Sequence, residues 1–96
     1  MRRIIYAGTS FYTGDTIAEA LMDYARVLAS KSRADAVFIP GRLPTGEVDK
    51  VEVLIGPASQ LVSEPVEDLG PDLVDAGAVA DLRDRTQRVE RMSIRD

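Results

Sequence analysis

The feature that most restricts how this chain can fold is a stretch of helical periodicity in its first third. From about residue 15 to residue 32, apolar side chains recur at spacings of three and four, which places them on one face of an α-helix. They are Ile17, Ala20, Leu21, Tyr24, Ala25 and Leu28. A helix with one apolar face must pack that face against another apolar surface, and the rest of the sequence has to supply it.

Four short segments have the composition of β-strands and can supply that surface. Residues 3–7 are apolar on both alternating faces, and residues 36–39 form a short apolar run. Residues 48–55 alternate between apolar and polar positions, which is typical of a strand with one face exposed to solvent. Residues 60–66 are restricted to the edge of a sheet, because Pro65 cannot donate a hydrogen bond to a neighbouring strand.

The two ends of the pattern complete the expected fold. Residues 8–14 contain glycines and hydroxyl side chains and are expected to form a loop. A second helix is predicted from Pro71 or Asp75 to about Met92. The expected order is therefore β-α-β-β-β-α. This order predicts an α+β fold, with a small, mostly antiparallel sheet and helices packed on one face.

Length and composition indicate one small globular domain. The chain has 96 residues and a mass of 10.5 kDa, with 45% hydrophobic and 29% charged residues. We expect residues 1–92 to form a single domain and residues 93–96 to be a tail.

The absence of two residue types restricts the chemistry. The sequence contains no cysteine and no histidine. Disulfides, zinc sites, thiol nucleophiles and Ser-His-Asp triads therefore have no residues to build them. We predict that the protein is not an enzyme, and that it holds no cofactor and no metal.

The charge distribution bears on partners and location. The net charge is −4, and residues 45–81 carry one lysine against nine carboxylates. Such an acidic middle repels phosphates, so nucleic acid is not an expected partner. No apolar run approaches the roughly 20 residues that span a bilayer, and no signal-peptide core is evident. We expect no membrane partner and a cytoplasmic location, and the excess of arginine over lysine suggests a bacterial genome.

The predicted loop offers a candidate ligand site. Backbone N–H groups at the start of the first helix, with the nearby hydroxyls, are a combination that binds small anions. The residues of this candidate site are Gly8, Thr9, Ser10 and Thr13. In the other interpretation, the same residues cap a helix and shape a turn.

A second set of residues is a candidate for an interface. Two adjacent aromatic residues lie in the predicted loop, and the last helix carries a narrow apolar stripe. The candidate interface residues are Phe11, Tyr12, Val79, Leu82 and Val89. Aromatic residues are enriched at the centres of interfaces, although the same side chains can equally belong to the core.

The predicted function follows from these exclusions. We expect a small non-catalytic module that interacts with proteins, most simply as a homo-oligomer such as a homodimer. The alternative is a regulatory module that binds a small anionic ligand at residues 8–15.

Overall fold

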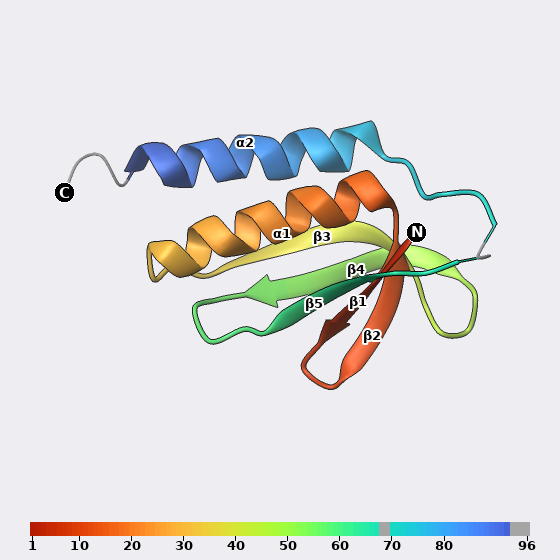
Figure 1. The fold of residues 1–96 in the computed structure, drawn as a ribbon. Coiled ribbons are helices and arrows are strands. Elements are labelled where there is room, and N and C mark those ends of the chain that lie inside the picture. Colours follow the sequence, from red (N-terminus) through yellow and green to blue (C-terminus); the bar gives the residue numbers. More distant parts are fainter. Residues whose placement is uncertain (68–69, 93–96) are drawn as a thin grey trace.

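Five strands form one antiparallel sheet, and two helices lie on the same side of it, in the computed structural model of the chain (Figure 1). The structure describes residues 1–67 and 70–92, so the predicted tail 93–96 lies outside the described residues. The elements are β1 (Arg2–Tyr6), β2 (Thr9–Thr13), α1 (Asp15–Ser30), β3 (Asp35–Arg42), β4 (Val48–Ile55), β5 (Leu61–Pro65) and α2 (Ala76–Met92). Across the sheet the order is β4-β3-β2-β1-β5. The predicted α+β class is confirmed.

The segment predicted to be a loop, residues 8–14, instead contains strand β2. β1 and β2 pair along their whole length, so that only Ala7 and Gly8 form the turn between them. Both residues have positive φ angles, 52° and 80°, which is the backbone of a type I′ hairpin turn. The predicted order therefore lacks one strand, and the observed order is β-β-α-β-β-β-α.

The remaining three strands overlap the predicted segments, but β3 is longer than the predicted residues 36–39, because it continues through Pro40 and Gly41 to Arg42. β3 and β4 pair along their whole length and are joined by a turn in which the Gly46 N–H donates to the Leu43 carbonyl at 2.8 Å. β5 pairs with β1 and ends at Pro65. Its place at the sheet edge is the one that the proline requires.

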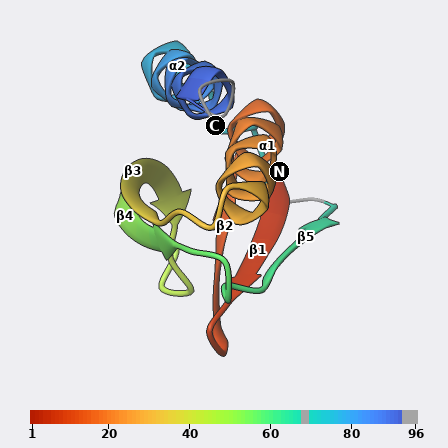
Figure 2. The same cartoon turned by 90° about the vertical axis from the view of Figure 1, so that its left-hand side faces the viewer.

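Helix α1 packs its predicted apolar face onto the sheet (Figure 2). Ile17, Leu21 and Leu28 are at most 1% exposed. They share one core with the inward-facing strand side chains, which are Ile4, Phe11, Val37, Ile39, Val53 and Ile55.

Helix α2 forms an outer layer over α1 and reaches the sheet at β3 (Figure 2). It begins at Ala76, because Asp75 caps it: the Ala78 N–H donates to Asp75 Oδ1 at 3.0 Å. Leu82 and Val89 are the buried apolar side chains of its inner face.

The sheet is almost interrupted between β2 and β3, which are joined by the single pair Tyr12↔Arg42. Pro40 of β3 has no N–H to extend this ladder. Instead, the hydroxyl of the fully buried Thr13 donates to the Pro40 carbonyl at 2.8 Å. Beyond this point the β1–β2 hairpin diverges from the β3–β4 hairpin (Figure 2).

Candidate functional site

The four residues predicted to bind an anion do not converge on one site. Gly8 and Thr9 are exposed at the tip of the β1–β2 hairpin, and Ser10 is half-buried further along β2. Thr13 lies at the opposite end of β2, buried, with its hydroxyl on the Pro40 carbonyl. The expected cradle is therefore absent from this segment, because its residues form a paired strand rather than a loop at the helix start.

The start of α1 is occupied by carboxylates of the chain itself. Both Oδ atoms of Asp72 lie 3.3 Å from the Asp15 N–H, and the amino group of Met1 lies 2.9 Å from Asp15 and 3.0 Å from Asp72. Hydrogen bonds to Asp15 and Asp72 raise the pKa of the amino group. Burial opposes ionisation of Asp72, but the contact with the amino group and the Asp15 N–H hold its pKa below the usual value. The place of an anion at this helix start is thus taken by Asp72.

The residues predicted to form an interface mostly belong to the core of the single chain. Phe11, Leu82 and Val89 are 4%, 1% and 7% exposed, and Val79 is half-buried against the same cluster. Phe11, Leu82 and Val89 pack under α1 or between the two helices, so they cannot anchor a partner while this core is intact, whereas Val79 keeps part of its surface exposed. Tyr12 differs, because it lies on the opposite face of β2 and is half-buried.

A network of polar groups ties α2 to the rest of the fold. Asp35 Oδ2 accepts the Tyr24 hydroxyl at 2.5 Å and Arg85 Nη1 at 2.7 Å, and Arg85 Nε also donates to Asp81 at 2.9 Å. Burial of Tyr24, and secondly its hydrogen bond to Asp35, raise the pKa of Tyr24 to about 12. Burial opposes the charge on Asp35, but the hydrogen bonds from Tyr24 and Arg85 hold its pKa below the usual value. Each of these polar groups has a hydrogen-bond partner within the network. The network is therefore suited to holding α2 against the rest of the fold rather than to transferring protons.

The acidic residues that the structure describes were also candidates for a metal site. Among residues 1–67 and 70–92, no group of three or more acidic side chains is placed to hold a metal ion.

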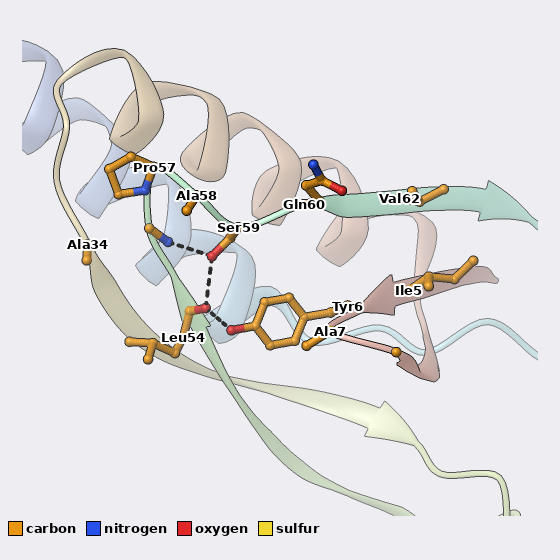
Figure 3. Close-up of a pocket in the computed structure, with 12 residues that line it drawn as sticks. Ile5, Tyr6, Ala7, Ala34, Leu54, Pro57, Ala58, Ser59, Gln60 and Val62 are labelled. Carbon is orange, nitrogen blue, oxygen red and sulfur yellow. Dashed lines mark hydrogen bonds between the residues drawn. The ribbon is translucent and has the colours of Figure 1, made fainter.

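An apolar groove of about 680 Å³ opens where the two hairpins diverge (Figure 3). Its walls include Ile5, Val62, Leu54 and Pro57. The hydroxyl of Tyr6 crosses the groove to donate to the Leu54 carbonyl (Figure 3). Ser59 also accepts the Gly56 N–H at 2.9 Å, so these polar groups of the lining are already paired and the groove offers mainly apolar contact (Figure 3).

The sheet face opposite the helices carries exposed apolar side chains. Phe38 of β3 is 60% exposed, Val48 and Leu54 of β4 are 50% and 59% exposed, and Val62 of β5 is 49% exposed. No described helix covers this side of the sheet, because α1 and α2 both lie on the other (Figure 2).

The sequence did contain a signal for this face. Val48 and Leu54 lie on the same face of β4 as Lys50 and Glu52. The face predicted to be exposed to solvent is therefore apolar at both of its ends.

Comparison with known proteins identifies no relative: no protein-family model matches the sequence, and no curated protein or solved structure matches it significantly. None of the helices within the described ranges is long and apolar enough to cross a membrane.

Proposed function

We propose that this chain is a small non-catalytic interaction module that assembles with a second copy of itself. The observation that carries the proposal is the outward sheet face, where Phe38, Val48 and Leu54 are each at least 50% exposed. Phe38 and Leu54 are diagonal neighbours across the β3–β4 ladder, and Val48 lies at the other end of β4. Exposed apolar side chains that lie together on a surface mark sites of protein association. Homodimers related by a two-fold axis are the commonest soluble oligomers, so a second copy is the simplest partner for this face.

The side-chain inventory supports the non-catalytic part of the proposal. The chain has no cysteine and no histidine, the residues that most often attack bonds or move protons near neutral pH. The network around Asp35 engages the Tyr24 hydroxyl and the Arg85 guanidinium in mutual hydrogen bonds. This arrangement leaves no free base beside a free nucleophile in that network.

The location of the module is proposed from the sequence alone. We propose that it comes from a bacterium, on the excess of arginine over lysine, and that it works in the cytoplasm. Fractionation of the source cells tests this, and recovery of the protein outside the cytoplasm would overturn it.

Light scattering on a size-exclusion column tests the assembly. The expected mass of the wild type at high concentration is near twice the monomer mass of 10.5 kDa. Leu54→Asp, which puts a charge on the outward face, should shift the mass towards the monomer. The matched control is Val74→Asp, because Val74 is 85% exposed and precedes α2, away from that face. A wild-type monomer at every concentration up to the millimolar range would refute the proposal.

A further inference from the structure

Strand β4 has an edge with which no other strand of the chain pairs, although the Tyr6 hydroxyl occupies the Leu54 carbonyl at its C-terminal end. The direction of its backbone groups can be derived from the adjoining turn. The Leu43 N–H donates to the Glu47 carbonyl at 2.8 Å, in the same register that continues through the β3–β4 ladder. Hydrogen-bonded and non-hydrogen-bonded pairs alternate along an antiparallel ladder, so the even-numbered residues of β4 direct their N–H and C=O groups away from β3. Two hydrogen bonds are consistent with this direction, because each joins an even-numbered residue of β4 to a partner that is not on β3. The Lys50 N–H donates to Asp49 Oδ1 at 2.7 Å, and the Leu54 carbonyl accepts the Tyr6 hydroxyl.

β4 is better suited to strand pairing than β5, the other edge of the sheet. β4 has eight residues and contains no proline, whereas β5 has five residues and ends at Pro65. An edge strand with free backbone groups can pair with a strand of another chain, and proline blocks such pairing.

The outward side chains of β4 are complementary to themselves. In chain order they are Val48, Lys50, Glu52 and Leu54, which is apolar, positive, negative and apolar. Val48 and Leu54 are 50% and 59% exposed. In the part of the chain that the structure describes, no ion pair involves Lys50 or Glu52.

From this pattern we infer that two copies of the chain join through antiparallel pairing of β4 with β4, centred on Val51. The inference rests on the proposed function and gives the register of the assembly. It places the contact at the β4 edge, where Val48 and Leu54 of the outward face meet the partner subunit, while Phe38 on β3 stays outside the strand pair. In this register Lys50 lies opposite Glu52 of the partner subunit, and Glu52 lies opposite the partner's Lys50. Val48 lies opposite the partner's Leu54, so apolar side chains meet at both ends.

The neighbouring registers lack this complementarity. Centring the pair on Lys50 places the two lysines opposite each other, and centring it on Glu52 places the two glutamates opposite each other. Like charges directly opposite across two strands are destabilising, whereas opposite charges stabilise the pair. The register centred on Val51 is therefore the one that the charges favour. In this register, the residues of each Lys50–Glu52 pair also have backbone groups that point away from β3 and towards the partner. Each pair can therefore exchange two N–H···O hydrogen bonds.

Charge exchange at the two positions tests the register. Lys50→Glu places a carboxylate opposite the partner's Glu52, and Glu52→Lys places two ammonium groups opposite each other. Each variant alone should dimerise at least about tenfold more weakly than the wild type, because two attractive pairs become repulsive. An equimolar mixture of the two variants should regain wild-type affinity as a heterodimer. Arg33→Glu and Glu67→Lys are the matched controls, since they make the same charge changes at exposed residues outside β4.

The outcomes separate this inference from the proposed function. If the wild type is dimeric and the single variants dimerise as tightly as their controls, or the mixture binds no better than its components, the register is wrong while the proposed function stands. If the wild type is monomeric, both fail.

A single cysteine provides an independent check, because the chain has none of its own. Val51→Cys should form a disulfide-linked dimer under mild oxidation, since residues at the centre of the pair lie about 5 Å apart at Cβ. Phe38→Cys, on β3 and one strand further from the edge, should form little. Equal cross-linking of the two variants would overturn the proposed centre.

Discussion

Replacement of Thr13 by valine tests the connection between the two halves of the sheet. The Thr13 side chain is fully buried, and its hydroxyl donates to the Pro40 carbonyl at 2.8 Å. Valine has nearly the same shape, so the substitution removes the donor and leaves the packing almost unchanged. Leaving this partly buried acceptor without a partner costs about 1.5 kcal/mol.

For a domain of this size, that loss corresponds to a fall in Tm of roughly 6–12 °C. Thermal and urea unfolding, followed by circular dichroism, would measure it; both proteins should be at the same low concentration, because assembly adds to apparent stability. Thr9→Val is the matched control, since Thr9 is exposed at the hairpin tip, and it should change stability by less than about 0.5 kcal/mol. A Thr13→Val variant as stable as the control would refute the role given to this hydrogen bond.

Three further predictions concern other parts of the molecule. Hydrogen bonds hold the pKa of Asp35 below its usual value, so its contribution to stability is present above the unfolded pKa of about 3.9 and is lost as pH falls through the lower folded pKa. Asp35→Asn should therefore flatten the fall in the free energy of unfolding between about pH 5 and pH 2 in urea titrations; an unchanged slope would contradict this. Gly14→Ala should destabilise the fold by about 1–3 kcal/mol, because the new Cβ would overlap the carbonyl oxygen of Leu73; a neutral effect in urea unfolding would show that this contact is not tight. Asp49→Ala should strengthen self-association in sedimentation equilibrium, because it frees the Lys50 N–H for a second copy, and weaker association would count against β4 as the interface.

The elements with strong periodicity could be predicted from the sequence. The apolar stripe of α1 identified its buried face, and the alternation along residues 48–55 gave strand β4 its bounds. Pro65 indicated an edge strand, and β5 is an edge. In each case the pattern reflects burial on one face, which local sequence reports directly.

Strand β2 could not be predicted in the same way. Its residues lie between Gly8 and Gly14, and its hydroxyl side chains are equally typical of loops. The turn uses Ala7 and Gly8 with positive φ, a pair that lacks the asparagine or aspartate usual in a type I′ turn. Pairing with β1 decided the structure, and pairing between strands is not visible in local composition.

The candidate site was misplaced for the same reason. Phe11 and Tyr12 were both expected in a loop as candidate interface residues, but in a strand the two point to opposite faces, so Phe11 enters the core. The self-complementary order of side chains along β4 was present in the sequence. It gained meaning only when the structure placed β4 at an open edge.

Hydrogen exchange at the Glu52 amide tests the assembly through β4 most directly. This N–H points away from β3, so in the monomer it faces solvent, whereas in the paired dimer it is bonded to the partner subunit. Nuclear magnetic resonance measurements at increasing protein concentration should show its exchange slowing as the dimer forms, while the amide of Gly8, in the exposed hairpin turn and outside the ladder, stays fast. Fast exchange at Glu52 in a sample whose mass is already that of a dimer would contradict the account.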